Sequence, residues 1–292
     1  MTVNLRAKNY ADAMVSTTTK IVENEAVAED TYRIRMIAPE IAQRAVPGQF
    51  VMLRMHGVDS PLIGRALAVY DVVAPPGDRG PTMIDLVYVR KGRLTQPLSM
   101  APVGAEIAVW GPLGNGFSPQ PCDHLILAVG GIGQTPMLML ANEALGNRTF
   151  GSRPIGYAGR VTLIYGARRA SLLAGVDDFR ATGMDVRLCT DDGSAGMHAR
   201  VPDLLESVLA EETNDSKVRV VTCGPEIMMQ RVAELCGDRQ LPCEVSMETP
   251  MACGIGICFS CVAKVRQPDG QWDYKRTCVE GPIFEADKIV WD

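Results

Sequence analysis

Four cysteines near the C-terminus have the residue type and the spacing to bind an iron–sulfur cluster. Cys253, Cys258 and Cys261 are separated by four and two residues, and Cys278 follows after sixteen more. Structural zinc sites usually use two short-spaced cysteine pairs, whereas C-x4-C-x2-C with a distant fourth cysteine is the plant-type arrangement for a 2Fe–2S cluster. The spacing therefore predicts that these four cysteines are the metal ligands.

Two glycines lie between the first two cysteines of this run. Side chains at Gly254 and Gly256 would obstruct a backbone that wraps around inorganic sulfides and donates N–H groups to them. Zinc binding and buried free thiols are the alternative interpretations, and the spacing favours the cluster over both. Four other cysteines are predicted to be small buried hydrophobic residues, namely Cys122, Cys189, Cys236 and Cys243.

A glycine-rich turn supplies a second kind of chemistry. The segment AVGGIGQTPML (128–138) follows an apolar strand and opens a helix. Its glycines permit a tight turn and let a phosphate approach the helix N-terminus, where free N–H groups favour anions. The third glycine comes too early for the standard dinucleotide fingerprint, so the turn by itself is weak evidence for nucleotide binding.

Three further segments, YGAR (165–168), TDDGSAG (190–196) and TCGPEIMM (222–229), also stand at the ends of expected strands. Ligands of open parallel sheets bind beyond the carboxyl ends of the strands, so the four segments together predict a dinucleotide site. Arg168 and Arg169 leave open whether it takes NAD or NADP, and NAD is expected. A nicotinamide pocket is expected to be lined by Cys223, Gly224 and Pro225. The full set of expected NAD-binding residues is Gly130, Gly131, Gly133, Thr135, Pro136, Asp191, Cys223, Gly224 and Pro225.

Composition narrows the class of protein. The chain has 292 residues, of which 47% are hydrophobic and 22% charged, as in ordinary globular proteins of two or three domains. A formal net charge of −5 gives no support to a nucleic-acid partner. The N-terminus lacks the apolar core of a signal peptide, and no apolar run approaches the roughly 18 residues of a membrane span. We expect a cytoplasmic protein with no membrane partner, in which clustered thiols bind metal rather than form disulfides.

The pattern of apolar residues divides the chain into three domains after a short tail. Residues 1–16 are expected to be a disordered tail. Residues 17–119 hold short β-rich runs separated by turns, which predict an antiparallel barrel or sandwich. Residues 120–243 alternate apolar strands with amphipathic helices, which predicts a doubly wound parallel sheet. Residues 244–292 are too few to bury a core, so a metal centre would have to stabilise this third domain.

The whole chain from about residue 17 resembles the ferredoxin-reductase superfamily. Within it, the chain is most similar to the electron-transfer subunits of the two-subunit, NAD-dependent (class B) dihydroorotate dehydrogenases. The resemblance is carried by PGQFVMLR, GPLGNGF, GGIGQTP, TDDGS, CGPEIMM and above all METPMACGIGICFSC with CVEGPIF. It implies an FAD-binding barrel, an NAD-binding α/β domain and a small 2Fe–2S domain.

The resemblance also implies a set of FAD-binding residues. The family's Arg-Pro-x-Ser segment corresponds here to Arg65-Ala66-Leu67-Ala68, so Arg65 would bind the flavin pyrophosphate and the family serine is replaced by Ala68. The family's Gly-x-Gly-Thr loop reads Gly92-Arg93-Leu94-Thr95 here, with one glycine lost. The implied FAD-binding residues are Arg65, Ala66, Leu67, Ala68, Val87, Tyr88, Val89, Leu94 and Thr95.

A mechanism and a partner follow from the same resemblance. Electrons from dihydroorotate, oxidised at FMN on a separate catalytic subunit, would pass through the 2Fe–2S cluster to FAD and then to NAD as hydride. The chain holds no barrel of roughly 250 residues for the dihydroorotate chemistry itself. It is therefore expected to be one half of an oxidoreductase of pyrimidine biosynthesis, in a heterotetramer of two catalytic and two electron-transfer chains.

Two alternative functions remain at the level of sequence. One is the reductase subunit of another redox complex, such as a ferredoxin–NADP oxidoreductase or a sulfide- or sulfite-linked enzyme. The other is a cluster-bearing regulatory or scaffold protein without a working flavin site, which is supported only by Ala68 and Leu94. A flavin absorption band beside that of the cluster would exclude the scaffold, and an identified catalytic partner would distinguish the redox complexes.

Overall fold

A computed structural model describes residues 14–57, 61–75, 77, 80–213 and 215–291 of the chain. Most of the predicted tail, residues 1–13, lies outside this range. The first strand begins at Val15, two residues before the expected start of the barrel domain. Within the described residues no helix combines the length and the apolar character needed to cross a membrane.

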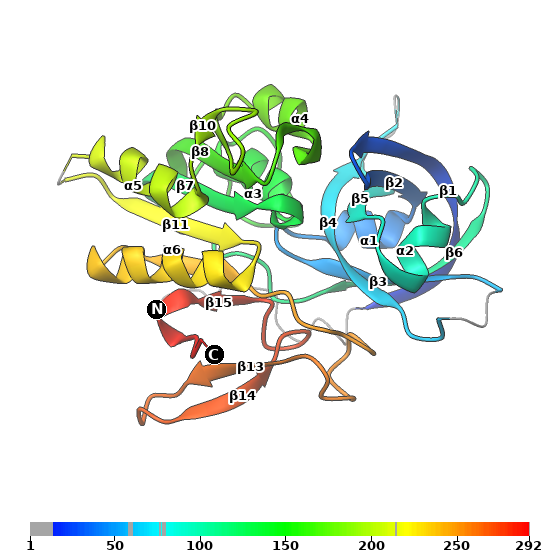
Figure 1. Ribbon diagram of the computed structural model, residues 1–292. Coiled ribbons are helices and arrows are strands. Elements are labelled where there is room, and N and C mark those ends of the chain that lie inside the picture. The colour runs from blue at the N-terminus through cyan, green and yellow to red at the C-terminus, as the bar shows by residue number, and fades with distance from the viewer. Residues whose placement is uncertain (1–13, 58–60, 76, 78–79, 214, 292) are drawn as a thin grey trace.

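The N-terminal part of the chain is a closed antiparallel barrel (Figure 1). Its strands follow the order β1-β2-β5-β4-β3-β6 around the barrel. Apolar side chains that alternate along the strands fill the interior, and Ile34, Leu53 and Leu86 are fully buried there. The strands are β1 (Val15–Ala28), β2 (Thr31–Ile37), β3 (Phe50–Met55), β4 (Arg65–Val73), β5 (Met83–Val89) and β6 (Glu106–Leu113).

Two short helices interrupt the barrel sequence, and the β-rich pattern did not predict them. They are α1 (Pro39–Arg44) and α2 (Gly92–Leu98). Each spans fewer than two full turns, which is too short to give a helical period of apolar residues in the sequence. Helix α2 contains the expected flavin loop, with consequences for Leu94 and Thr95 that are described below.

The second part is a seven-stranded sheet with the order β10-β9-β8-β7-β11-β12-β15. All neighbouring strands are parallel except β15, which is antiparallel to β12. The parallel strands are β7 (Cys122–Gly130), β8 (Ala158–Ala167), β9 (Asp185–Thr190), β10 (Met197–His198), β11 (Val218–Cys223) and β12 (Cys243–Ser246). The connecting helices are α3 (Met137–Ala144), α4 (Val176–Ala181), α5 (Val201–Ala210) and α6 (Glu226–Asp238).

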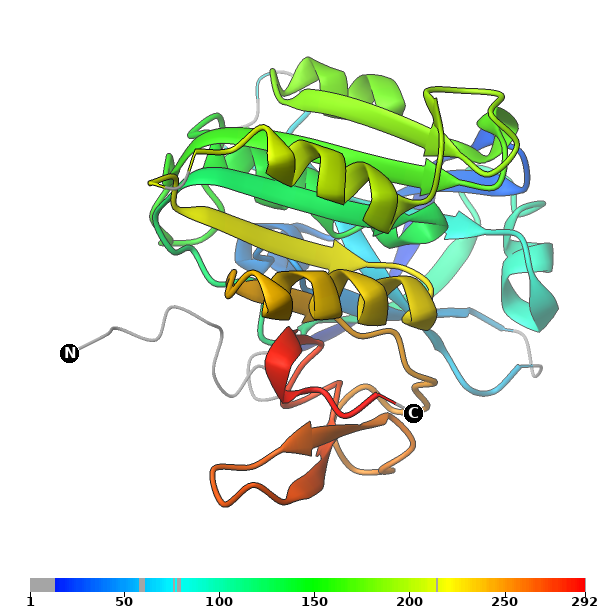
Figure 2. The same cartoon turned by 60° about the vertical axis from the view of Figure 1, so that its left-hand side comes forward.

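Strand β7 shows why this sheet is covered on both faces. Its side chains alternate between two cores, with Leu125 and Leu127 in one and Ile126 and Ala128 in the other. Helices α5 and α6 contribute to the second core and lie together on one face of the sheet (Figure 2). The continuous apolar run in the sequence is therefore the mark of a central strand buried on both sides, as predicted.

The connection between β8 and β9 holds a 3-10 turn and a short helix rather than one continuous helix. Residues Ala170–Leu172 form a 3-10 turn, and α4 begins only at Val176. Gly175 separates them with a φ of +69°, a left-handed conformation that ends one helical segment and precedes the next.

The barrel and the sheet share a core. Tyr70 of β4 and Val87 of β5 pack in the same cluster as Leu127, Met137 and Phe179 of the nucleotide domain. The Tyr70 hydroxyl also donates a hydrogen bond of 2.7 Å to Asp178 of α4. The two domains are thereby held in one arrangement.

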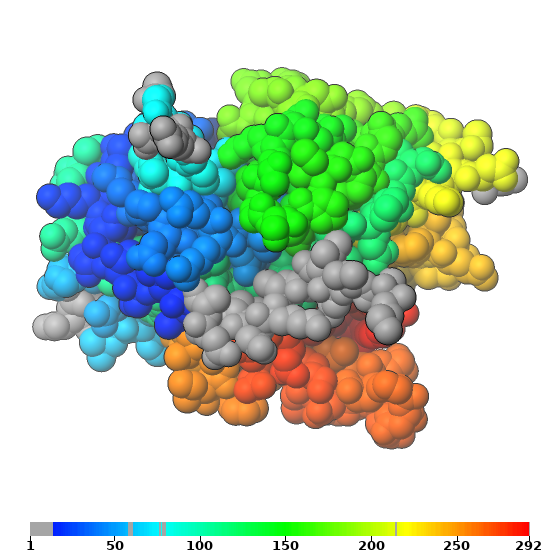
Figure 3. Space-filling model, turned by 180° about the vertical axis from the view of Figure 1, so that it is seen from behind, coloured from blue at the N-terminus to red at the C-terminus, as the bar shows by residue number. Residues whose placement is uncertain are grey.

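The C-terminal part is tied to both of the others (Figure 3). Its hairpin, β13 (Val262–Arg266) with β14 (Trp272–Arg276), forms a separate two-stranded sheet. Strand β15 (Ile283–Glu285) then returns to the edge of the nucleotide sheet beside β12. On the barrel side, Trp110 Nε1 of β6 donates a hydrogen bond of 3.0 Å to the Cys253 carbonyl oxygen. The small domain therefore has the support of two neighbours in addition to any metal centre.

A buried ion pair in the nucleotide domain provides a test of this fold. Both carboxylate oxygens of Glu143, whose side chain is fully buried, accept hydrogen bonds of 2.9 and 2.8 Å from Arg153. The Glu143→Gln variant should lose about 3–5 kcal/mol of unfolding free energy, because it leaves the Arg153 charge buried without its partner. Urea unfolding followed by far-UV circular dichroism measures this change.

The exposed pair of Arg239 and Glu206 is the matched control. Glu206→Gln should cost less than about 1 kcal/mol, since solvent screens such pairs. Equal effects of the two substitutions would show that burial of the Glu143 pair makes no special contribution.

Candidate functional site

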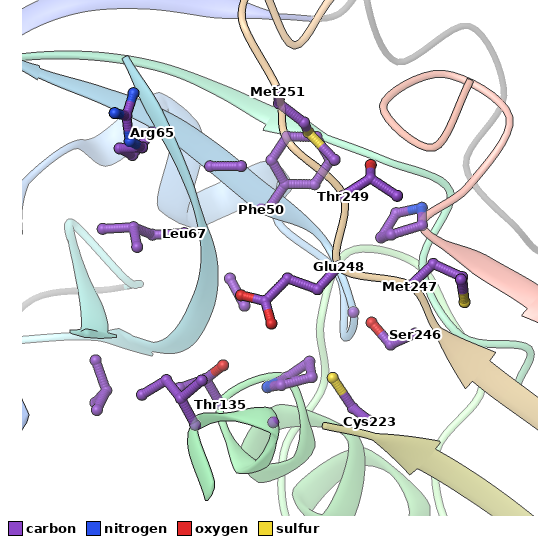
Figure 4. A pocket seen from close by; sticks show the side chains of 18 of the residues that line it. Phe50, Arg65, Leu67, Thr135, Cys223, Ser246, Met247, Glu248, Thr249 and Met251 are labelled. Carbon is purple, nitrogen blue, oxygen red and sulfur yellow. The ribbon is translucent and has the colours of Figure 1, made fainter. Parts of the chain in front are cut away.

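A cavity of about 440 Å³ lies where the barrel, the glycine turn and the C-terminal part meet (Figure 4). We call it the inner cavity. The barrel contributes Gly48, Phe50, Arg65, Ala66, Leu67, Ala68 and Val87, and the nucleotide domain contributes Ile132, Gly133, Thr135, Pro136 and Cys223. The segment after β12 closes it with Ser246, Met247, Glu248, Thr249, Pro250 and Met251, together with Pro282.

The inner cavity collects five of the nine residues expected to bind FAD. Arg65, Ala66, Leu67 and Ala68 line it from the start of β4, and Val87 lines it from β5. The side chain at Ala68 is only a methyl group, so the family's hydroxyl is absent from this wall. The backbone of β4 and the Arg65 side chain supply the polar groups that remain on the barrel side.

The other four residues lie elsewhere. Tyr88 points into the barrel, where its hydroxyl donates a hydrogen bond of 2.9 Å to Asn24, and Leu94 belongs to the same buried core. The Thr95 hydroxyl accepts a hydrogen bond of 2.7 Å from the Lys91 backbone N–H and so fixes the start of α2. Val89 lines a second cavity. Alternation along β5 explains the difference between Val87 and Tyr88.

Arg65 has the chemistry to bind a phosphate. Its Nη1 donates hydrogen bonds of 3.3 and 3.1 Å to the carbonyl oxygens of Ile63 and Gly64, which orient the guanidinium. Among the described residues no carboxylate forms an ion pair with it. Its charge therefore remains available to an anion, and a guanidinium can contact two oxygens of a pyrophosphate at once.

A second cavity, of about 960 Å³, adjoins the first along the carboxyl ends of β7, β8, β9 and β11. We call it the outer cavity. It is lined by Gly130, Gly131, Asp191, Gly224 and Pro225, while Gly133, Thr135, Pro136 and Cys223 line the inner cavity. All nine residues expected to bind NAD thus face one or other of two connected spaces. Their assignment to NAD binding stays a prediction.

Steric constraints explain two of the glycines in the turn. A Cβ atom on Gly133 would lie 2.3 Å from the Cys223 carbonyl oxygen, and one on Gly130 would lie 2.7 Å from Met228 Sδ. The turn after β7 can approach the end of β11, and the end of β7 can approach α6, only because these positions lack side chains. Gly131 has a φ of +54° and open space around it, so its backbone faces the outer cavity.

The two arginines after β8 have different environments. Arg169 forms an ion pair with Glu29, the residue after β1, and Glu29 also accepts a hydrogen bond of 2.5 Å from Ser171. The Arg169 charge is thereby used to join the barrel to the nucleotide domain. Arg168 and Arg169 both line the outer cavity, where Arg200 and Arg231 also lie.

In the part of the chain that the structure describes, two residues line both cavities, Ile132 and Glu248. The Glu248 side chain is exposed and extends into the space between the domains (Figure 4). Burial, and to a smaller extent the negative charge of Glu248, raise the pKa of the nearby Cys223 thiol to about 12. Cys223 is therefore a neutral thiol at the cavity wall.

The four predicted metal ligands lie close together in the C-terminal part, where Cys261 and Cys278 pack against Phe50 and Met52 of the barrel. The Cys258 thiol lies within hydrogen-bonding reach of Cys253, and the Cys278 thiol within reach of Cys261. Within the described part of the chain, no three His, Cys, Asp or Glu side chains are grouped to hold a single metal ion. Two separate thiol pairs are what a 2Fe–2S cluster needs, because each iron takes two cysteines and the sulfides complete its coordination.

The local surroundings shift the pKa values of two of these thiols in opposite directions. Hydrogen bonds from Ser260 and the contact with Cys253 lower the pKa of the exposed Cys258 thiol to about 6. A lowered pKa favours the thiolate, which is the form that binds metal. Burial raises the pKa of Cys278 to about 12, so a metal must displace its proton.

The glycines of the loop have a packing role that their spacing did not reveal. A Cβ atom on Gly254 would lie 2.5 Å from Met52 Cγ, and one on Gly256 would lie 2.8 Å from Val279 Cγ1. Both residues have positive φ angles, +75° and +81°. The Arg276 Nη1 donates a hydrogen bond of 2.9 Å to the Gly256 carbonyl oxygen and holds the loop in place.

The segment between β12 and the first cysteine carries no sequence pattern that predicts a role for it. Ser246 to Met251 line the inner cavity, yet only Met247 to Met251 were noted, as part of a family motif. A carboxylate five residues before Cys253 was the one available signal, and a single Glu in a loop carries little information without its surroundings.

Two family models match the chain. The oxidoreductase FAD-binding domain matches residues 18–117, and the iron–sulfur cluster binding domain of dihydroorotate dehydrogenase B matches residues 248–290. The chain is 34% identical to the electron-transfer subunit of dihydroorotate dehydrogenase B (NAD(+)) from Desulforamulus reducens, over 94% of this chain and 97% of that protein. It is 31% identical to the same subunit from Geobacillus thermodenitrificans, over 92% and 96%.

Solved structures are similar as well. An NADH-dependent reduced ferredoxin–NADP oxidoreductase superposes with a TM-score of 0.78 at 29% identity, covering 94% of this chain and 90% of that chain. Phthalate dioxygenase reductase, at 16% identity and a TM-score of 0.58, shares the fold. The chain belongs to the electron-transfer subunits of the NAD(+)-dependent dihydroorotate dehydrogenase B family.

Proposed function

We propose that this chain receives electrons from dihydroorotate, oxidised at FMN on a separate catalytic subunit, and passes them through a 2Fe–2S cluster and FAD to NAD+. A bound flavin exchanges two electrons with a nicotinamide and one at a time with an iron–sulfur cluster, so it links the two kinds of carrier. This electron transfer takes place in the cytoplasm, in a heterotetramer of two catalytic and two electron-transfer chains.

One observation carries this proposal. The segment that leaves β12 lines the inner cavity from Ser246 to Met251 and reaches the first cluster cysteine, Cys253, two residues later. The inner cavity adjoins the outer cavity, and Ile132 and Glu248 line both. A flavin in the inner cavity would therefore have the nicotinamide site on one side and the cluster loop on the other.

The residues present fit this assignment of cofactors. Arg65 would hold the flavin pyrophosphate, and the backbone of Ala66 to Ala68 would border the ring. Gly131 and Gly224 would allow the NAD phosphates to approach the ends of β7 and β11. Trp110 anchors the cluster loop through the Cys253 carbonyl oxygen, so the cysteines are held against the barrel.

The exposed part of the cluster loop would dock on the catalytic subunit. Ile257 and Phe259 are 73% and 63% exposed and flank the exposed Cys258. Ile255 instead packs against the barrel residues Met52 and Leu113. Large apolar side chains beside a redox centre are a plausible protein contact, because they lose water on association.

One specific observation favours a second candidate function. The solved structure with a TM-score of 0.78 is a ferredoxin–NADP oxidoreductase, so the same architecture serves another electron donor. Copurification with a dihydroorotate-oxidising subunit supports the first function, and reduction by ferredoxin without such a subunit supports the second.

The cluster ligands can be tested one at a time. Serine substitutions of Cys253, Cys258, Cys261 and Cys278 should each abolish or severely reduce iron content and the cluster absorption bands, because each removes one thiolate ligand. Cys122→Ala, at a buried cysteine of β7, is the control and should retain the full iron content. Normal iron content in all four serine variants would refute the assignment.

The flavin assignment depends on Arg65. Arg65→Ala should weaken FAD binding by roughly 10- to 100-fold, because a hydrogen bond to a charged group contributes roughly 1.5–3 kcal/mol. Titration of the flavin-free protein with FAD, followed by flavin fluorescence, measures the Kd. Arg54→Ala on the neighbouring strand β3 removes an arginine that does not line the inner cavity and should leave the Kd unchanged.

The docking surface gives a third test. Ile257→Glu and Phe259→Glu should prevent copurification with the catalytic subunit and stop dihydroorotate-dependent NAD+ reduction. NADH oxidation with an artificial acceptor should survive, since it needs only the FAD. Ile155→Glu places the same charge at an exposed apolar position of the nucleotide domain and should not affect assembly. If both loop variants assemble and couple normally, electrons enter elsewhere.

A further inference from the structure

Glu248 stands at the shared border of the inner and outer cavities. Among the described residues, Glu248 and Ile132 alone line both. It stands on the segment that follows β12, and its carboxylate extends into the inner cavity opposite Thr135 and Cys223 (Figure 4). A group that occupied both cavities at their shared border would therefore lie beside this carboxylate.

The Glu248 charge is not compensated by the protein. Among the described residues no hydrogen bond or ion pair to its carboxylate is found, although arginines line the outer cavity. Its negative charge acts on the Cys223 thiol, whose pKa is already raised by burial, so it extends into the cavity wall. An acidic side chain kept without a partner at a ligand passage is a candidate for recognition of a positive charge.

The expected ligand changes its charge in the reaction. The nicotinamide ring of NAD+ carries one positive charge, and transfer of a hydride to the ring gives NADH, whose ring is neutral. The adenosine and pyrophosphate parts are the same in both forms. A carboxylate beside the ring therefore attracts the oxidised form and has no such attraction for the reduced form.

We propose that Glu248 makes this site selective for NAD+ over NADH. The inference rests on the proposed function, because it requires the nicotinamide ring to enter the inner cavity next to the flavin. The Glu248 carboxylate binds the cationic ring of the substrate and loses that interaction when the ring becomes neutral. Product release is thereby favoured, and Glu248 acts as a specificity-determining residue for the redox state of the nicotinamide.

The surroundings of Glu248 strengthen its attraction for the cationic ring. Water is largely displaced when a flavin and a nicotinamide fill the inner cavity, and charge interactions are stronger where water is excluded. The walls near Glu248 are neutral, since Cys223 is held as a thiol and Ile132, Met247 and Pro250 are apolar. Glu248 is thus the charged group of the inner cavity on the nicotinamide side, whereas Arg65 lies at the barrel side.

The test compares two ligands on the oxidised protein loaded with FAD. One is NAD+, and the other is 1,4,5,6-tetrahydro-NAD, a neutral analogue of NADH that cannot reduce the flavin. Calorimetry or flavin difference spectra give the two dissociation constants. In Glu248→Gln the Kd for NAD+ should rise at least about tenfold, equivalent to about 1.4 kcal/mol, while the Kd for the neutral analogue changes little.

A matched control separates redox selectivity from general binding. Asp191 lines only the outer cavity, so Asp191→Asn should change the two dissociation constants by the same factor. The Glu248→Asp variant, which keeps the charge, should retain selectivity for NAD+. In turnover, Glu248→Gln should also raise inhibition by NADH relative to the KM for NAD+.

The outcomes are distinct. If the unaltered protein binds both ligands and Glu248→Gln shifts their Kd values equally, Glu248 is a structural residue and the inference fails. A shift of the FAD midpoint potential without any change in selectivity would place its action on the flavin and also overturn the inference. If the unaltered protein binds neither ligand, the proposed function itself fails.

Discussion

The apolar contact between the barrel and the nucleotide sheet is the constraint on which the rest of the structure depends. Tyr70 and Val87 of the barrel are buried in one cluster with Leu127, Met137 and Phe179, so the two domains share part of their buried core. Polar contacts at the rim, Tyr70 with Asp178 and Glu29 with Arg169, fix the orientation. Because the domains meet at the carboxyl ends of the parallel strands, both cavities open along this junction.

The segment after β12 connects the three parts in a short distance. It begins as a strand of the nucleotide sheet, continues as a wall of the inner cavity and ends in the cysteine loop. The loop is held by Trp110, by Arg276 and by close packing of Gly254 on Met52. Electron transfer requires short and constant distances between the redox centres. A segment that is fixed at both ends keeps the cysteine loop at a constant distance from the inner cavity.

The fold can be predicted from the sequence more fully than the directions of the side chains at the site. The apolar run of β7 and its alternation with helices predict a parallel sheet correctly, because a buried central strand has a distinctive composition. The short helices α1 and α2 leave no periodic signal, and Gly175 divides the helical connection between β8 and β9. At the site, the motif residues at the strand ends lie along the two cavities, whereas Tyr88, Leu94 and Thr95 face the barrel core or a helix start. Side-chain direction depends on strand register and local turns, which the motif does not contain.

The sequence by itself determined the four cysteines, the glycine turn and the order of three domains. These features depend on local spacing, since ligand geometry and backbone conformation are set within a few residues. Only the tertiary structure decided that the cysteines form two facing pairs, that Arg169 is engaged by Glu29, and that Glu248 stands between two cavities. Each of these facts joins residues that are distant in the chain, and such contacts arise only when separate domains pack against one another.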